Sequence, residues 1–458
     1  MERESWLLLS ATLAVSVVSY LAILRLRSGA GRLPPGPRPL PLIGNLLDLR
    51  GGNLHHTLAR LARAHGAPVM RLELGLAAAV VISSRDAAAE AFTRHDRRLA
   101  ARAVPDATRA LGFSDRSMVW MPSSDPRWKA LRGVVAAHVF SPRSLAAARG
   151  ARERKARDLV DYLRGRAGEV VAVGEAVYGG VLNLVSSAVC SVDVVDVGAE
   201  SAAGLREAVE DLVELVAKPN VSDLFPFLRR LDLQGRRRHA ARQIGKVIRV
   251  LDGIIDRRLA DAKTSSMAKQ KQGDDFLGTL LELVSTGKIT REDVTTILFD
   301  VFTAGSDTIA ITEAMRLHPV APILLPHQAV EDGVEIGGYA VPKGTTVIFN
   351  AWAIMRDPAA WERPDEFLPE KFLDGAAAKV VDFRGKDYEF IPFGSGRRMC
   401  PGVPMAERVV PLILASLLHA FEWRLPDGLP AEKLDVSEKF TTANVMAVPL
   451  KAVPVVIS

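Results

Sequence analysis

One short segment dominates the sequence: Phe393-Gly394-Ser395-Gly396-Arg397-Arg398-Met399-Cys400-Pro401-Gly402, a glycine-rich loop that ends in a cysteine and runs into an apolar stretch. Its glycines allow the backbone to approach a flat, bulky group closely. Pro401 stands where a helix would begin, so the sulfur of Cys400 is expected at the positive end of a helix dipole, which favours the thiolate. Arg398 is a fixed cation that suits a carboxylate. The loop therefore predicts a thiolate beside a planar, acid-bearing ligand.

This chemistry is that of a haem-thiolate centre, in which a cysteine sulfur ligates the iron and favours O–O cleavage. The pattern F-x-x-G-x-R-x-C-x-G is fully present and resembles the cysteine loop of the cytochrome P-450 family. The resemblance implies that Cys400 is the axial ligand of a haem b iron. It also implies that Phe393, Arg398 and Gly402 help to bind the haem. A buried core cysteine after a surface loop is the alternative.

The sequence predicts one large domain rather than several. The 458 residues can bury a large core, and no linker divides them. Only two cysteines occur, which argues against a disulfide framework and favours a reducing, cytosol-facing compartment. The net charge of +6 suits an anionic membrane surface or an acidic redox partner. Basic residues are scattered along the chain, so nucleic acid is not an expected partner.

The N-terminus predicts a membrane anchor. Ser5 to Leu24 is uncharged, mostly apolar and long enough to cross a bilayer once, and the arginines that follow place the C-terminal side in the cytoplasm. A cleaved signal peptide is the alternative, but no clear small-x-small site closes the run. We expect a single-pass anchor over residues 1–32 and a haem-thiolate monooxygenase domain over residues 33–458. The resemblance to plant microsomal members implies the endoplasmic reticulum membrane, with the domain in the cytosol.

The resemblance implies the cytochrome P-450 fold, which is mainly α with a smaller β region. A helix is expected over Leu54 to Ala64, and strands over Val69 to Leu74 and Ala79 to Ser83. Helical patterns dominate from Ser144 to Ala262, broken by the aromatic stretch Asp223 to Gly235. That stretch resembles a region of the plant geraniol 8-hydroxylase-like subfamily. Further expected elements are a turn at Val341–Thr345 and an apolar helix over Met405–His419.

Trp128-Lys129-Ala130-Leu131-Arg132 is expected on a helix. At this spacing the indole N–H of Trp128 and the guanidinium of Arg132 share one helix face, so they can grip a carboxylate together. In the family, a W-x-x-x-R pattern here binds a haem propionate. His327 is read either as a neighbour of a propionate or as a surface histidine. The pair His55-His56 is interpreted as a solvated loop pair, and no C-x-x-C or paired-histidine cluster suggests zinc.

An apolar stripe runs through Arg291 to Thr308 and ends in Ala304-Gly305-Ser306-Asp307-Thr308. The resemblance places this A-G-x-D-T segment on a helix over the open face of the haem, where Asp307 and Thr308 relay protons to dioxygen. A helix C-terminus with a polar cap is the alternative.

The next motif departs from the family. Glu313 and Arg316 match its E-x-x-R helix, whose buried ion pair braces the cysteine loop, but only Ile309 to Thr312 separate them from Thr308. Relatives have several dozen residues there. On one continuous helix, Thr308 and Arg316 would lie about 12 Å apart, although they belong on opposite sides of a haem. The sequence therefore indicates an internal deletion, by a skipped exon, a faulty gene model or a real truncated isoform.

The resemblance implies a monooxygenase that inserts one oxygen atom from O2 into a small apolar substrate, a terpenoid by subfamily likeness. Electrons would come from NADPH through a cytochrome P-450 reductase that docks on basic residues such as Lys129 and Arg397. Lys371 replaces the arginine of the family's P-E-R-F pattern and predicts a weaker contact with Glu313. One alternative is a catalytically inactive product of the same gene. Another is a haem-thiolate isomerase or dehydratase, against which the intact Ala304–Thr308 segment argues.

Overall fold

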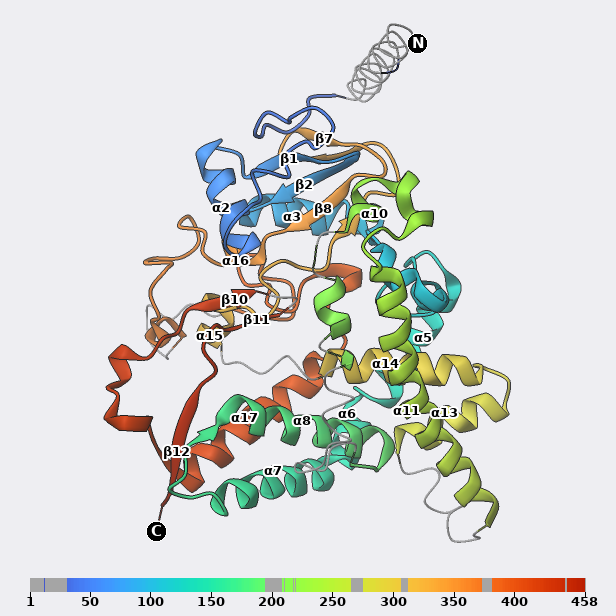
Figure 1. Ribbon diagram of the computed structural model, residues 1–458, viewed down its shortest axis with the longest axis vertical. Coiled ribbons are helices and arrows are strands. Elements are labelled where there is room, and N and C mark those ends of the chain that lie inside the picture. The colour runs from blue at the N-terminus through green and yellow to red at the C-terminus, as the bar shows by residue number, and fades with distance from the viewer. Residues whose placement is uncertain are drawn as a thin grey trace, which may run out of the picture.

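The computed structural model describes residues 31–193, 208–264 except 210, 217 and 219, 275–305, 312–372, 381–440 and 443–457, together with residue 12. The expected anchor over residues 1–32 lies almost wholly outside these ranges. Asp307 and Thr308 also lie outside them. Within the described residues, a sheet-rich part occupies one end of the molecule and long helices occupy the other (Figure 1). The fold is mixed α and β and mainly helical, as predicted.

The α-helices are α2 (Leu54–Ala64), α3 (Arg85–Arg94), α4 (Asp96–Leu99), α5 (Pro126–His138), α6 (Pro142–Ala147), α7 (Arg149–Arg164), α8 (Val173–Cys190), α10 (Val221–Leu224), α11 (Arg236–Thr264), α13 (Phe276–Ser285), α14 (Arg291–Gly305), α15 (Thr312–Leu317), α16 (Ala351–Ile354) and α17 (Val403–Ala420). The 3-10 helices are η1 (Asp106–Asp115), η2 (Pro226–Leu231), η3 (Pro369–Phe372), η4 (Gly396–Arg398), η5 (Pro426–Gly428) and η6 (Ala431–Lys433). The helices predicted around Leu54, Trp128 and Met405 are confirmed.

The strands are β1 (Val69–Leu74), β2 (Ala77–Ile82), β3 (Ala101–Arg102), β4 (Val171–Ala172), β5 (His327–Gln328), β6 (Val334–Ile336), β7 (Tyr339–Val341), β8 (Thr346–Phe349), β9 (Phe421–Arg424), β10 (Glu438–Phe440), β11 (Asn444–Met446) and β12 (Lys451–Val456). The largest sheet has the order β1-β2-β8-β5-β3. Its register pairs Val69 with Ile82, and β8 runs parallel to β2. The predicted strands and the turn between β7 and β8 are therefore confirmed.

The cysteine loop connects two apolar cores. Phe390 and Ile391, just before the loop, are fully buried in the core beside the large sheet. Val409 and Ile413, about two and three turns into α17, lie in a second core with α7 and α8. Because both ends of the loop are fixed by burial, the two cores define the position of Cys400.

Helix α14 is buried along the predicted stripe, with Val294, Ile297 and Leu298 fully inaccessible. It packs against α5, α8, α11 and α13, whereas α15 packs against η3. The two helices therefore have different neighbours.

Two described helices, α8 and α17, are long and apolar enough to cross a membrane by length and composition alone. More than half of α8 is buried inside the protein, as expected of a core helix. Helix α17 packs against α7 and β9.

The prediction of a solvated loop pair is wrong for His55 and confirmed in part for His56. Both residues lie in the first turn of α2 rather than in a loop, and the side chain of His55 is completely buried, whereas that of His56 is exposed. The apolar face of α2, which includes Leu58 and Leu61, packs into a core with β1 and β2. This packing turns His55 toward the C-terminal hairpin β10–β11 rather than toward solvent.

Candidate haem-thiolate site

The cysteine loop is closed by a hydrogen bond from the backbone N–H of Cys400 to the carbonyl of Phe393, at 3.0 Å. The backbone N–H groups of Gly402 and Val403 donate to the sulfur of Cys400. Helix α17 begins at Val403 rather than at Pro401, and the proline of its first turn is Pro404. The sulfur thus lies at the helix N-terminus as predicted, but the helix starts two residues later than expected.

Burial opposes the thiolate of Cys400. It raises the pKa of the thiol, although the Gly402 N–H and the charge of Arg132 act to lower it. The N–H groups at the helix N-terminus lower the pKa of this thiol, as predicted, but desolvation outweighs them. An iron ion bound at the sulfur would favour the thiolate.

Gly396 is required by a close approach. Its backbone has φ +65°, and a Cβ there would lie only 2.2 Å from the carboxylate of Asp96. The same carboxylate accepts a hydrogen bond from the N–H of Arg397 at 3.0 Å and pairs with its guanidinium at 3.2 Å. Asp96 therefore anchors the loop to α4, a contact that the loop pattern itself does not reveal.

Arg398 is buried and bonded to three backbone carbonyls. It donates to Ala100 at 2.7 Å, to Met118 at 3.1 Å and to Met121. The Trp128 indole N–H also donates to Met118 O, at 3.0 Å, and the Arg398 guanidinium lies 4.8 Å from the Trp128 ring centroid. The structure thus brings together Trp128 and Arg398, two predicted site residues that are far apart in sequence.

Two further guanidiniums complete the cluster. Arg132 donates to Met399 O and lies 5.4 Å from the Trp128 ring centroid. Arg102, which no motif singled out, is half-buried on β3 and donates to Leu325 O. Burial lowers the pKa of Arg102 to about 9, and the charges of Arg398 and Arg132 add to this. For Arg398, burial first and then Arg132 lower the pKa to about 10.

This cluster of Arg102, Arg132 and Arg398 fits an acid-bearing ligand. Among the residues the structure describes, none of the three has an ion pair with a carboxylate. The buried Nε of Arg102 has no hydrogen-bond partner there either. Buried guanidiniums that repel one another need a compensating anion, and two propionates would provide it.

His327 lies beside this cluster and is not a surface residue. It is paired with Arg102 across β3 and β5, and its Nδ1–H donates to Leu99 O at 2.8 Å. Burial lowers the pKa of His327 well below its usual value, and the Arg102 charge lowers it further. A neutral imidazole is therefore held next to the guanidiniums.

Replacing Arg398 by lysine is expected to lower the free energy of unfolding by about 2 kcal/mol. A single lysine ammonium cannot donate to all three backbone carbonyls that the planar guanidinium of Arg398 reaches. Denaturant unfolding of R398K would measure the change. The exposed neighbour Arg397 provides the control. R397K should have nearly the same free energy of unfolding as the parent protein. Equal destabilisation by R398K and R397K would contradict a special role for the buried guanidinium of Arg398.

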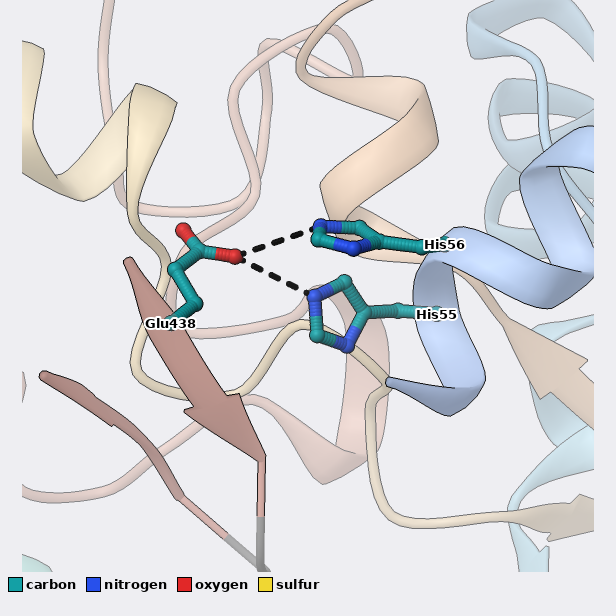
Figure 2. Close-up of side chains that lie close together, drawn as sticks. All are labelled: His55, His56 and Glu438. Carbon is teal, nitrogen blue, oxygen red and sulfur yellow. Dashed lines mark hydrogen bonds and ion pairs between the residues drawn. The ribbon is translucent and has the colours of Figure 1, made fainter. Parts of the chain in front are cut away.

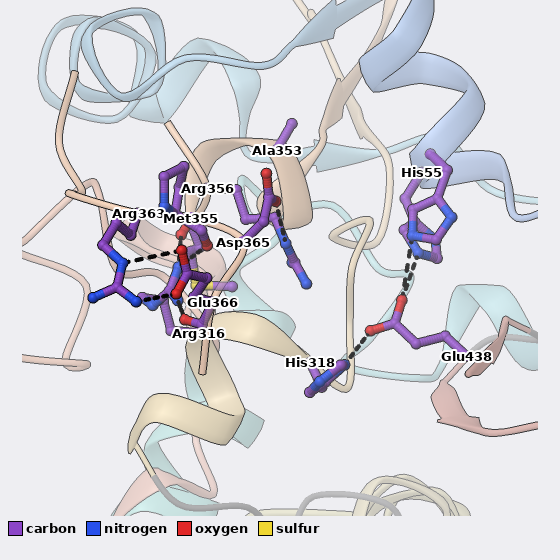
Figure 3. A network of polar contacts seen from close by, with 12 residues as sticks. His55, Arg316, His318, Ala353, Met355, Arg356, Arg363, Asp365, Glu366 and Glu438 are labelled. Carbon is purple, nitrogen blue, oxygen red and sulfur yellow. Dashed lines mark hydrogen bonds and ion pairs between the residues drawn. The ribbon is translucent and has the colours of Figure 1, made fainter. Parts of the chain in front are cut away.

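The Glu313–Arg316 pair is completely buried on α15, with contacts of 2.7 and 2.9 Å between the guanidinium and the two carboxylate oxygens. Arg316 also donates to the carbonyls of Met355, Pro364 and Glu366 (Figure 3). Burial acts to raise the pKa of Glu313, but the hydrogen bonds from Arg316 and from the Leu368 N–H lower it overall. The pair therefore ties α15 to the segment after α16.

Lys371 contributes little to this pair. Its ammonium lies 3.9 Å from the Glu313 carboxylate, beyond hydrogen-bond distance, and donates to Arg363 O at 3.1 Å instead. The structure agrees with the expectation that lysine at this position makes a weaker contact.

A second buried carboxyl, which sequence reasoning missed, connects α14 to the cluster. Asp300 accepts hydrogen bonds from the Ser117 hydroxyl at 2.7 Å and the Met118 N–H at 2.8 Å. Met118 O in turn accepts from Trp128 and Arg398. Burial raises the pKa of Asp300 to about 7, although these donors act in the opposite direction.

We expect Asp300 to make the stability fall as pH rises. Because its pKa is about 7 in the folded protein and 3.8 ordinarily, the folded state holds more protons between these values. The free energy of unfolding should therefore drop from pH 5 to pH 8 by about 2–3 kcal/mol relative to D300N. Denaturant unfolding of both proteins at the two pH values measures this difference. Parallel pH profiles would contradict it.

The proposed distal residues Asp307 and Thr308 lie outside the described part of the chain, which follows α14 as far as Gly305. A cavity of about 750 Å³ opens at the sheet-rich end, with Arg102, Arg109, Asp223 and Lys343 in its wall. Cys400 does not line it. Arg102 is the one member of the guanidinium cluster that also lines this cavity.

Comparison with known proteins agrees with this geometry. The family model of cytochrome P-450 matches residues 34–312 and 309–445. Cytochrome P-450 76M5 of Oryza sativa subsp. japonica is 61% identical over 511 positions, which cover 100% of this chain and 99% of that protein. Oryzalexin E synthase and ent-cassadiene C11-alpha-hydroxylase 1 of the same plant are 57% and 55% identical, over 99% and 100% of this chain and 98% and 100% of their own.

The matches also bear on the short connection before Glu313. The family model matches in two segments that meet at residues 309–312. The alignment to the 61% identical relative spans 511 positions against 458 residues in this chain, a difference of 53. These lengths agree with the several dozen residues that the sequence indicates are missing.

Proposed function

Because this chain belongs to the cytochrome P-450 family and is a monooxygenase by that membership, we propose that it inserts one oxygen atom from O2 into an apolar terpenoid. The observation that carries the proposal is the buried guanidinium cluster beside the Cys400 loop. Haem b, when bound, supplies oxygen activation. Cys400 would hold the iron, while Phe393 and Gly402 shape the loop around the ring.

The chain's own residues would bind and orient the cofactor as follows. Trp128, Arg132 and Arg398 would hold its propionates, and Arg102 would add a charge from the other side of the cluster. Glu313 and Arg316 would fix the segment that precedes the cysteine loop. On the distal side, Asp307 and Thr308 would pass protons toward dioxygen through their carboxyl and hydroxyl groups.

The substrate class rests on the relatives. One of them is named for hydroxylation of ent-cassadiene at carbon 11, and others for the synthesis of oryzalexins. We propose a terpenoid of this kind, an apolar hydrocarbon or a lightly oxygenated derivative. Because fold alone does not set the substrate, this part of the proposal depends on the likeness of whole sequences.

Electrons would come from NADPH through cytochrome P-450 reductase. Lys129 is exposed on α5 and is available to an acidic partner. Arg397 is also exposed, although Asp96 shares its charge. We place the docking surface around these two residues.

We further propose a single-pass anchor over residues 1–32 in the endoplasmic reticulum membrane, with residues 33–458 in the cytosol. Two groups of exposed apolar side chains support a membrane on this side: Leu40, Leu42, Ile43 and Leu47 before α2, and Phe227, Leu231 and Leu233 around η2. They lie near the turn between β1 and β2, at the sheet-rich end (Figure 1).

The test uses purified protein with reductase, NADPH and a panel of terpenoid hydrocarbons that includes ent-cassadiene. The proposal predicts an NADPH-dependent product that carries one oxygen atom from isotopically labelled dioxygen. No such product with any panel member would overturn the terpenoid assignment. An unlabelled, rearranged product would instead support an isomerase or dehydratase.

A second candidate is a non-catalytic product of the same gene. The observation in its favour is the short connection between Thr308 and Glu313, where the family model divides. Transcripts that all carry an in-frame insert at this junction would assign the activity to a longer chain.

A further inference from the structure

Far from the cysteine loop in sequence, three histidines surround one carboxylate at the base of the C-terminal hairpin. His55 Nε2 and His56 Nε2 both lie 3.3 Å from the same oxygen of Glu438 (Figure 2). His318, just after α15, bonds to the other oxygen of Glu438 (Figure 3). The groups come from α2, β10 and the end of α15, which are joined here by side chains alone.

Two of the side chains in this cluster are buried, and one is exposed to solvent. His55 is completely buried and the Glu438 side chain is 9% exposed, whereas His56 is 44% exposed. Both histidine contacts, at 3.3 Å, are longer than the usual N–H···O hydrogen bond of about 2.7–3.2 Å. Two nitrogens facing one oxygen at that distance leave room for an ion between them.

The backbone around these side chains is fixed. The side chain of Asn53, just before α2, donates to Glu438 O at 2.9 Å and accepts from the Phe440 N–H at 3.0 Å. Asn350 donates to His55 O at 2.9 Å. These bonds hold α2 against β10, so the two imidazoles and the carboxylate are positioned before any ligand arrives.

The spacing matches a transition metal. Zinc binds imidazole nitrogen and carboxylate oxygen at about 2.0–2.2 Å, so tetrahedral ligand atoms lie about 3.3 Å apart. The nitrogens of His55 and His56 and the oxygen of Glu438 all lie within 4.8 Å of one another. Two imidazoles and one carboxylate are a zinc ligand set that leaves a fourth position for water.

We propose that His55, His56 and Glu438 form a binding site for zinc or a similar divalent transition metal, separate from the proposed haem iron. The exposed side of His56 is the way in from solvent. Through the second oxygen of Glu438, the ion would also restrain His318, which follows Arg316 by two residues. Metal binding would therefore stabilise the connection between α2, β10 and the buried ion pair of α15.

The test is equilibrium dialysis of the full, tag-free chain against zinc, with the bound metal measured by mass spectrometry. The proposal predicts one zinc per chain, bound at least tenfold more weakly by H56Q, in which a half-exposed side chain loses its ligand nitrogen. H239Q is the matched control, because His239 is 39% exposed and lies 3.5 Å from Asp211. That variant should bind zinc as the parent does, and both variants retain Cys400.

Thermal unfolding provides the second readout. Saturating zinc should raise the melting temperature of the parent and of H239Q by a few degrees and leave H56Q unchanged. Melting in the absence of zinc shows whether H56Q is folded. The proposal is overturned if the parent binds no zinc at unit stoichiometry, or if H56Q and H239Q bind it equally. Either outcome would make the cluster a hydrogen-bond network only.

Discussion

Replacing Cys400 by serine is expected to abolish the thiolate-type Soret band in the reduced carbon-monoxide difference spectrum, together with all NADPH-dependent turnover. The sulfur belongs to the only thiol of the cysteine loop, and two backbone N–H groups donate to it. A serine hydroxyl accepts the same hydrogen bonds but does not ionise at neutral pH, so it cannot give the thiolate spectrum. Difference spectra of C400S and the parent measure the change directly.

Cys190 is the matched control. It is fully buried at the end of α8, and burial raises the pKa of its thiol to about 12. C190A should retain the thiolate-type band at the parent's intensity per folded chain. A band that survives in C400S but disappears in C190A would reverse the assignment of the ligand.

Replacing Glu313 by alanine is expected to lower the free energy of unfolding by about 3–5 kcal/mol, because it leaves the Arg316 guanidinium buried without its partner. Arg316 would keep its bonds to three carbonyls, but these do not neutralise its charge. The destabilisation would be measured by denaturant unfolding, with the change in midpoint at constant slope as the criterion.

Glu366 provides the comparison for this prediction. It is an exposed carboxylate that pairs with the exposed Arg363, and its own backbone carbonyl, which accepts from Arg316, is unchanged by E366A. We expect E366A to unfold almost as the parent does. Similar destabilisation by E313A and E366A would show that the buried pair has no special role.

Local patterns in the sequence predict local structure well in this protein. The period of apolar residues gives α2 and β1 with the observed bounds, and the position of Trp128 on a helix follows from its neighbourhood. The pattern around Cys400 predicts a closed loop before a helix, although α17 begins two residues later than expected.

Long-range contacts could not be predicted in the same way. His55 faces Glu438, which is 383 residues away, so nothing near His55 in sequence indicates that it is buried. Arg102 joins the guanidinium cluster only because β3 pairs with β5 beside it. Asp300 lies within an apolar stripe, and its partner Ser117 belongs to an irregular segment whose path depends on the whole fold.

Three features that we propose for the proximal side of the haem site are present in the described part of the 458-residue chain. The cysteine loop, the guanidinium cluster and the Glu313–Arg316 pair are all in place. The short connection affects the stretch between α14 and α15, which carries the proposed proton relay. We therefore infer that the chain holds haem through Cys400, and that the missing residues bear on oxygen activation rather than on cofactor binding.

The central claim is that Cys400 ligates haem in this chain. Its most direct test is the reduced carbon-monoxide difference spectrum of the 458-residue protein, recorded beside a version in which the residues missing before Glu313 are restored. The account predicts a thiolate-type Soret band from both proteins. A band from the longer protein alone would contradict it, and would show that haem and Cys400 do not meet when the connection is short.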